Sequence, residues 1–335
     1  MNPSSNPTPA LSPKPFFALD LLQRIGSQNL SLLIALALLV AIFGSLRPDV
    51  FFSPRNLINI GLAVTVLGVL ALAQTTVIVS GGLDISVGSI VGLSTMAAAL
   101  TLQTVDNTGI GILAALAAGL AAGVINGLII TYGRVNSVIA TLGTMTAFRG
   151  VAFLTSGGNS IAITNEGMSV LGSGIVLGLP IQLIVLAMIA VGFFIFLRST
   201  IIGRNIYALG GNRTVARLAG IDINRYQIGI YAMSGLAAGL AGVLLTARTL
   251  SGQPASGSQG IEMEAITAAI LGGCALQGGK GTIGGTLLGV LILGVLNNGM
   301  ILTSVPQFYQ LIAKGALLVG AVMIQEQQMR RSGEG

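Results

Sequence analysis

VLGVLALAQTTVIVSGGLDISVGSIVGLSTMAAAL, residues 66–100, joins two apolar runs through a short loop rich in glycine and serine. The runs extend over about 57–79 and 85–103, and each is close to the ~20 apolar residues that a helix needs to cross a bilayer. The loop carries one acid, Asp84, in a chain that has few charges. Two long apolar runs separated by so short a loop predict a hairpin of two membrane-spanning helices.

The rest of the chain repeats this alternation of apolar runs and short polar breaks. Of 335 residues, 53% are hydrophobic and only 8% are charged, and the mean hydropathy is +0.89. A soluble domain has roughly 25% charged residues. The sequence therefore predicts an all-α polytopic membrane protein with about ten segments, near 30–46, 57–79, 85–103, 109–131, 136–154, 175–197, 226–247, 262–276, 282–300 and 307–324. The eighth is short for a full crossing, which makes it a candidate for a broken or re-entrant helix.

The two ends of the chain lack this pattern. Residues 1–29 have prolines at positions 3, 7, 9, 13 and 15 among many Ser and Asn, which predicts a disordered tail. The polar stretch before residue 30 is too long for a secretory signal peptide. We therefore divide the chain into a tail over 1–29, a transmembrane domain over 30–324 and a second tail over 325–335.

The distribution of Lys and Arg predicts the orientation, because these residues concentrate in short cytoplasmic loops. With both termini in the cytoplasm, eleven cations lie on the inner side and three, Arg47, Arg55 and Arg248, on the outer side. Two more, Arg149 and Lys314, lie within segments. The net charge of +6 then reflects basic cytoplasmic loops and does not indicate nucleic acid as a partner.

The residue types exclude most catalytic chemistry. Histidine is absent and the one cysteine is Cys274, so the chain has no Ser-His or Cys-His nucleophile and no internal disulfide. The ten acids show no metal-ligand spacing, and GGKGT at 278–282 lacks the spacing of a phosphate-binding loop. We expect no catalytic, metal or cofactor site, and no binding of ATP by this chain itself.

The most polar interior segment is RSTIIGRNIYALGGNRTVARLAGIDINRYQ, residues 198–227, which is predicted to be a cytoplasmic loop over 198–226. Within it, the residues of a short capped helix are Gly211, Asn212, Arg213, Val215, Arg217, Leu218 and Gly220. Asn212 is a good N-cap, Gly220 a good terminator, and Val215 and Leu218 give the helix a small apolar face. The alternative is a solvated basic loop held near anionic lipid.

Two loops resemble each other within the chain. GGLDISVGSIVG at 81–92 and GGKGTIGGTLLG at 278–289 share glycines and aliphatic residues at the same offsets, and both lie on the inner side of the predicted topology. If this echo reflects duplication, the shared sidedness indicates a parallel repeat. The alternative is chance similarity among glycine-rich apolar segments, since small residues also let spanning helices approach closely.

Several motifs occur in one order along residues 30–324: SGGLDISVGS at 80–89, RVNSVIATLGTM at 134–145, YALGGNRTVARLAGI at 207–221, EMEAITAAILGG at 262–273, GGKGTIGGTLLG at 278–289 and GVLNNGM at 294–300. In these motifs the chain resembles the membrane-spanning permease subunits of ribose-type sugar importers of the ATP-binding cassette class. The resemblance implies a multi-pass protein of the bacterial cytoplasmic membrane and makes 30–324 the permease domain.

The same resemblance implies the partners and the mechanism. A second permease subunit, identical or related, would complete the path, a cytoplasmic ATPase would drive it, and an extracytoplasmic sugar-binding protein would deliver the substrate. The helix over 211–220 would be the coupling helix seated on the ATPase. Transport would proceed by alternating access. The substrate would be ribose or a related sugar, with furanosyl signalling compounds and nucleosides as alternatives.

Polar side chains within the segments are candidates for the path, because a buried amide or hydroxyl in lipid needs a partner or a cavity. They are Gln74, Thr75, Asn126, Thr141, Thr144, Asn297 and Asn298. The alternative for each is a hydrogen bond between helices.

Four charged residues have a double interpretation. Asp84 can cap the third helix through the backbone N–H of Ser86 or Val87, or form an ion pair with Lys280 that opens and closes during transport. Glu262 and Glu264 favour the first turn of a helix, or form a gate or docking contact on the outer face.

Two other classes of function compete with an importer. An ion-coupled secondary carrier would also have many spans, but such carriers usually rely on intramembrane acids or histidines. A membrane scaffold could use the basic loop to bind any acidic partner.

Overall fold

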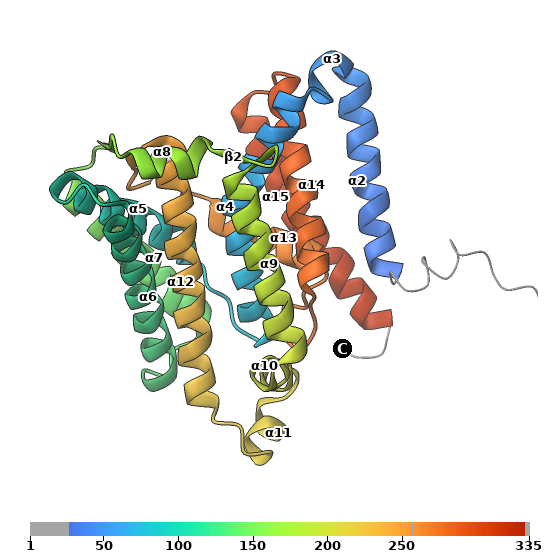
Figure 1. The fold of residues 1–335 in the computed structure, drawn as a ribbon. Coiled ribbons are helices and arrows are strands. Elements are labelled where there is room, and N and C mark those ends of the chain that lie inside the picture. The colour runs from blue at the N-terminus through green and yellow to red at the C-terminus, as the bar shows by residue number, and fades with distance from the viewer. Residues whose placement is uncertain (1–26, 256, 332–335) are drawn as a thin grey trace, which may run out of the picture.

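The computed structural model describes residues 27–255 and 257–331, which form a bundle of long helices lying side by side (Figure 1). The long helices are α2 (Ser27–Leu46), α4 (Pro54–Val79), α5 (Val87–Thr104), α6 (Thr108–Tyr132), α7 (Ser137–Ser156), α9 (Ile181–Ser199), α12 (Ile223–Thr249), α14 (Ile283–Leu302) and α15 (Gln307–Arg331). The mainly helical architecture confirms the predicted fold class.

Short elements connect the long helices. At one end of the bundle lie α3 (Pro48–Phe51) and α8 (Glu166–Ser173), and at the other α10 (Ile201–Gly211) and α11 (Arg213–Leu218), while α13 (Ile261–Leu271) lies among the long helices (Figure 1). Two antiparallel strand pairs complete the fold: β1 (Ile161–Ala162) with β4 (Ser251–Gly252), and β2 (Ile175–Val176) with β3 (Leu179–Pro180). Ile161 faces Gly252, and Ile175 faces Pro180.

Seven of the described helices are long and apolar enough to cross a membrane: α4, α5, α6, α7, α9, α12 and α14. Shorter apolar stretches cover Leu30–Leu46 of α2 and Gln307–Met323 of α15. Helix α13 has 11 residues and is about 16 Å long, roughly half of the ~30 Å hydrocarbon core. The eighth segment is therefore too short for a full crossing, while the total of about ten segments and their sidedness stay predictions.

The structure corrects the ends of several predicted segments. The sixth begins at Ile181 and not at 175, because the β2–β3 hairpin occupies the difference, with Leu177 and Gly178 at positive φ in its turn. The loop predicted over 198–226 is largely helical, in α10, α11 and the start of α12. Helix α15 continues past 324 to Arg331, into the predicted second tail. Of the first predicted tail, only the beginning of α2 belongs to the described residues.

Side-chain caps fix where most of these helices begin. The Asn107, Asn136 and Asn165 side chains accept hydrogen bonds from backbone N–H groups in the first turns of α6, α7 and α8. Thr200 and Thr282 do the same for α10 and α14. Because the first N–H groups of a helix have no partner within it, each cap satisfies a donor that is costly to leave unpaired in an apolar surrounding.

The core forms where α12 packs against α4, α5 and α6. Helices α6 and α12 meet backbone to backbone: a Cβ atom added to Gly235 would lie 2.6 Å from the Cα atom of Gly123, and one added to Gly119 would lie 2.7 Å from that of Gly239. Both helices repeat glycine every four residues along this contact, the spacing by which small residues let spanning helices approach closely.

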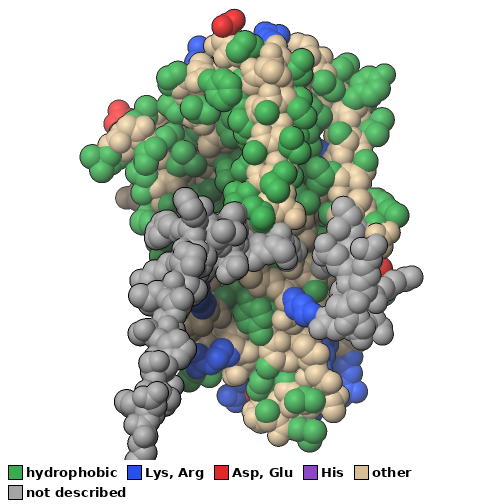
Figure 2. Space-filling model, turned by 90° about the vertical axis from the view of Figure 1, so that its right-hand side faces the viewer, with side chains coloured by type: hydrophobic (Ala, Val, Ile, Leu, Met, Phe, Trp, Pro, Cys, Tyr) green, Lys and Arg blue, Asp and Glu red, His purple; other side chains and the backbone are tan. Residues whose placement is uncertain are grey.

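Charge is distributed unevenly along the bundle axis. The N-terminal end of α2 and the C-terminal end of α15 both point toward the end of the bundle that carries α10 and α11 (Figure 1). On the face shown in Figure 2, hydrophobic side chains cover most of the upper part, and most of the visible Lys and Arg lie lower, toward the end with α10 and α11, with a few at the upper edge. This distribution agrees with the predicted placement of the cations near both termini.

Candidate functional site

Asp84 is the centre of a buried polar cluster between α4 and α12. It lies in the loop that joins α4 to α5 and is fully buried. Its Oδ1 atom accepts hydrogen bonds from the backbone N–H of Ser86 at 3.0 Å and from the Ser86 hydroxyl at 2.6 Å, and its Oδ2 accepts one from the Ser234 hydroxyl of α12 at 2.8 Å. Burial raises the pKa of this carboxyl, and the bonds from Ser86 and Ser234 act in the opposite direction.

Besides α12, the helices α4, α6 and α7 also form hydrogen bonds with this loop. The Gln74 amide of α4 donates to the Asp84 carbonyl, and the Asn126 amide of α6 donates to the Ser86 hydroxyl at 2.7 Å. From α7, the Thr141 hydroxyl accepts from the backbone N–H of Ile85 at 3.2 Å. The amide oxygens of Gln74 and Asn126 are buried without a hydrogen-bond partner among the described residues. The loop is therefore a junction at which four spanning helices meet.

The two interpretations of Asp84 differ in outcome. The predicted bond to the backbone N–H of Ser86 is present. Asp84 is nevertheless not the cap of α5, because the helix begins at Val87 and its N-cap residue is Ser86, so Asp84 closes the turn that precedes the helix. Lys280 has an exposed side chain, whereas both carboxylate oxygens of Asp84 are bonded to serines. An ion pair between Asp84 and Lys280 would require these serine bonds to change, and it stays a prediction.

The two glycine-rich loops meet in space. A Cβ atom added to Gly278 would lie 2.9 Å from the Cα atom of Gly81, and the backbone N–H of Gly279 donates to the Val79 carbonyl at 2.8 Å. Gly210, near the end of α10, lies against both: a Cβ atom there would lie 2.6 Å from the Gly279 nitrogen and closer still to the Val79 carbonyl oxygen. The loops thus lie at the same end of the bundle, as predicted, and the helix before α11 rests on them.

Helix α11 begins and ends where the sequence predicted. The Asn212 side chain accepts from the backbone N–H groups of Thr214 at 2.9 Å and Val215 at 3.1 Å, and Gly220 has a φ of +83°. Val215 is 60% exposed and Leu218 is 83% exposed. The apolar face of this helix therefore does not pack on the chain itself and is open to a partner.

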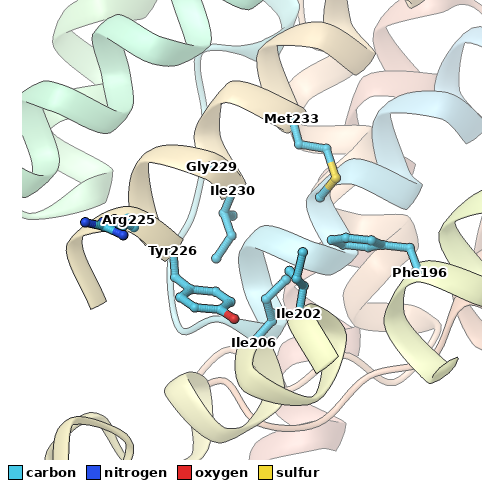
Figure 3. A pocket seen from close by; sticks show the side chains of 8 residues that line it. All are labelled: Phe196, Ile202, Ile206, Arg225, Tyr226, Gly229, Ile230 and Met233. Carbon is cyan, nitrogen blue, oxygen red and sulfur yellow. The ribbon is translucent and has the colours of Figure 1, made fainter. Parts of the chain in front are cut away.

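Two cavities near this end of the bundle adjoin α11 and α12, and a third, of about 590 Å³, lies between α9, α10 and the start of α14. The first, of about 930 Å³, is lined by polar residues that include Arg134, Ser137, Arg213 and Arg217, so it reaches from α11 to the loop beside Asp84. The second, of about 460 Å³, lies between α9, α10 and α12 (Figure 3).

The second cavity is lined mainly by apolar side chains. Figure 3 shows Phe196, Ile206 and Met233 around it, with Arg225 directed away. The Tyr226 hydroxyl at its edge already accepts a bond from the Asn205 amide at 2.6 Å. This cavity therefore offers few hydrogen-bonding groups to a sugar.

The structure brings some of the predicted path residues together and leaves the others apart. Gln74, Asn126 and Thr141 join the Asp84 cluster, and Thr144 donates to the Thr141 carbonyl at 3.3 Å.

The other predicted path residues lie outside this cluster. Thr75 bonds with Thr286 of α14 at 2.6 Å. Asn298 exchanges two amide hydrogen bonds, of 2.8 and 3.1 Å, with Asn56 of α4. Asn56 lies 18 residues before Gln74, or about 27 Å along the helix, so this contact is far from the Asp84 cluster. Thr75 and Asn298 therefore make the helix-to-helix bonds of the alternative interpretation. The Asn297 amide oxygen is buried without a partner among the described residues.

Both acids of α13 lie in its first turn, as predicted, and each faces a cation from another helix. Glu264 accepts from Lys314 of α15 at 2.7 Å, and a Glu262 carboxylate oxygen lies 3.8 Å from a guanidinium nitrogen of Arg149 in α7. Sequence reasoning noted Arg149 and Lys314 as charges within segments but did not pair them. It missed Ser234 entirely, because a lone serine in an apolar run carries no local signal.

Comparison with known proteins places these features in a family. Residues 56–322 match the family model described as branched-chain amino acid transport system / permease component. The ribose import permease protein of Bacillus subtilis (strain 168) is 41% identical over 300 residues, covering 89% of this chain and 92% of the relative.

Two other relatives are named for different sugars. The L-arabinose ABC transporter permease protein of Azospirillum brasilense is 40% identical over 281 residues, covering 83% of this chain and 82% of the relative. The D-allose transport system permease protein of Escherichia coli (strain K12) is 37% identical over 290 residues, covering 86% and 89%. No solved structure matches this chain.

Proposed function

Since this chain belongs to the family of branched-chain amino acid transport system permease components, we propose that it is the membrane-spanning permease subunit of an ATP-binding cassette importer for a monosaccharide. One observation carries the substrate class: relatives named for ribose, arabinose and allose share 37–41% of their residues with it over most of its length. The subunit itself performs no enzymatic reaction, and ATP is hydrolysed by a partner. Ribose or a related sugar is the proposed cargo.

The family implies the partners, and the exposed surface of α11 supports one of them, the ATPase. Val215 and Leu218 of α11 are apolar and open to solvent, which supports α11 as the helix that docks on a cytoplasmic ATPase. Arg213 and Arg217 line the polar cavity on the other side of the same helix. An extracytoplasmic sugar-binding protein delivers the substrate, and a second permease subunit completes the path across the bacterial cytoplasmic membrane.

Movement of α11 has a direct physical route into the bundle. Helix α10 precedes α11 with only Asn212 between them, and its Gly210 lies in backbone contact with the two glycine-rich loops. One loop carries Asp84, which is bonded to Ser234 of α12. Because packed backbones transmit displacement, we expect ATPase closure to shift both loops together, and alternating access to follow.

The gate or docking contact predicted for Glu262 and Glu264 on the outer face stays part of the proposal. Glu262 and Glu264 link α13 to α7 and α15 respectively, so separating these helices would break both contacts. On the inner side, Asp84 and Lys280 are proposed to pair in another conformation, after the serine bonds of Asp84 are released. Among the polar residues of the segments, the buried unpartnered amide oxygens favour Gln74, Asn126 and Asn297 as path-lining groups.

The test is uptake by whole cells that express the complete transporter. Uptake of radiolabelled D-ribose, L-arabinose and D-allose is measured after ATP depletion and, separately, after an uncoupler has abolished the membrane potential at maintained ATP. We expect at least one sugar to enter, and its uptake to stop only on ATP depletion. Uptake that stops with the potential at full ATP would instead establish the ion-coupled carrier.

A further inference from the structure

The first turn of α13 holds two acids in contrasting surroundings. Glu264 and Lys314 form a closed ion pair at 2.7 Å, and both side chains are 23% exposed. Glu262 is almost completely buried, and its nearest contact with Arg149 is 3.8 Å, which is longer than a hydrogen bond. The second pair is therefore an ion pair without a direct hydrogen bond.

The Glu262 site leaves several charged atoms without partners. Glu262 Oε2 and the Nε and Nη2 atoms of Arg149 are buried, and none of them has a hydrogen-bond partner among the residues that the structure describes. Buried charged groups are normally paired and fully hydrogen-bonded, because leaving a buried charge without partners is strongly unfavourable. Glu262 of α13 thus offers an unused acceptor, and Arg149 of α7 offers unused donors. Together they indicate a binding site for a group that can both donate and accept hydrogen bonds.

The backbone around Glu262 is shaped to admit the carboxylate. Gly88 lies in the first turn of α5, and a Cβ atom there would lie 2.6 Å from the Ser258 carbonyl oxygen and closer still to Glu262 Oε2. The carboxylate therefore lies against the positive end of the α5 dipole, which favours a negative charge. Arg149 keeps 20% of its side chain exposed, so the pair is open on the α7 side.

Sugar hydroxyls have the chemistry that this site lacks. Each hydroxyl donates one hydrogen bond and accepts others, so two neighbouring hydroxyls can donate to a carboxylate and accept from a guanidinium. We propose that Arg149 and Glu262 bind neighbouring hydroxyls of the monosaccharide during its passage. This inference rests on the proposed function and assigns the step to two named side chains.

The experiment uses the complete transporter, with its ATPase and binding protein, in proteoliposomes. The probe is whichever of D-ribose, L-arabinose and D-allose the wild-type complex imports. Glu262→Gln preserves the size of the side chain and removes its charge, whereas Arg149→Lys preserves the charge and removes the planar guanidinium. The control is Gln182→Met, since Gln182 is also buried with an unpartnered oxygen but lies between α9 and α12. The measurement is sugar imported per ATP hydrolysed at saturating loaded binding protein.

We expect Glu262→Gln and Arg149→Lys each to lower sugar imported per ATP about tenfold, the effect of losing one hydrogen bond to a charged group. Stimulation of the ATPase by the binding protein should persist, and Gln182→Met should keep the wild-type ratio. A deoxy analogue that lacks a bound hydroxyl should show the same loss in the wild type, and this loss should not add to that of Glu262→Gln.

Two results would overturn the site. One is a wild-type ratio in both variants, and the other is loss of the assembled complex in both, which would make the pair purely structural. A wild-type complex that imports none of the three sugars with ATP would contradict the proposed function instead, so the two failures are distinguishable.

Discussion

Replacement of Gly210 by Ala tests the route from α11 into the bundle. The added Cβ would lie 2.6 Å from the Gly279 nitrogen, and closer to the Val79 carbonyl oxygen, where ordinary contacts are 3.4 Å or more. The closer of these contacts decides the shift, so the backbone must move by more than about 1 Å, which costs ~1–3 kcal/mol for overpacking. The same shift would break the 2.8 Å bond from Gly279 to Val79, worth a further ~0.5–1.5 kcal/mol.

Gly211→Ala is the matched control, because a Cβ at Gly211 meets nothing within 4 Å. We expect Gly210→Ala to lower the free energy of unfolding by about 2–4 kcal/mol, and Gly211→Ala to change it by less than about 0.5 kcal/mol. Denaturant titration of both variants in the same detergent measures the difference. In proteoliposomes, Gly210→Ala should also reduce the sugar imported per ATP. Equal unfolding midpoints for the two variants would refute the close backbone contact.

Three further substitutions probe separate parts of the account. Asp84→Ala removes the acceptor of the buried Ser86 and Ser234 groups and should cost about 1–3 kcal/mol of unfolding free energy; unchanged stability in denaturant titration would contradict the carboxylate cluster. Leu218→Asp should weaken copurification of the ATPase about tenfold or more while the permease stays folded in size-exclusion chromatography, and full recovery of the ATPase would argue against docking through α11. Asn298→Leu should lower the free energy of unfolding by about 1–3 kcal/mol, because it leaves the Asn56 amide unpaired. Asn297→Leu should instead lower sugar uptake, and uptake that falls in Asn298→Leu but not in Asn297→Leu would remove Asn297 from the path.

The sequence predicted the spans well where length and hydropathy alone decide them. Helices α4 and α14 lie within three residues of their predicted ends, because a run of ~20 apolar residues has few alternatives in a membrane. The sixth segment failed because residues 175–180 are as apolar as a span but turn at Leu177 and Gly178, and only the backbone conformation distinguishes the two. Helix α10 was missed because the polar residues Arg204 and Asn205 hid an apolar face, formed by Ile206 and Leu209 at helical spacing.

Local contacts of the site were predictable and long-range ones were not. The bond from the Ser86 N–H to Asp84 spans two residues and follows from general capping chemistry. The bond from Ser234 to the same carboxylate spans 150 residues of chain, and no motif around Ser234 announces it. Likewise the sequence contains Glu262 and Arg149 far apart along the chain, and only the folded structure places their charged groups 3.8 Å from each other.

The most direct test of the proposed function is sugar uptake by proteoliposomes that contain the purified permease, its ATPase and its binding protein. D-Ribose, L-arabinose and D-allose are supplied outside and ATP inside, and each protein is omitted in turn. The account predicts ATP-dependent accumulation of at least one of these sugars only when all three proteins are present. Accumulation without the ATPase, or none with the complete set, would contradict it.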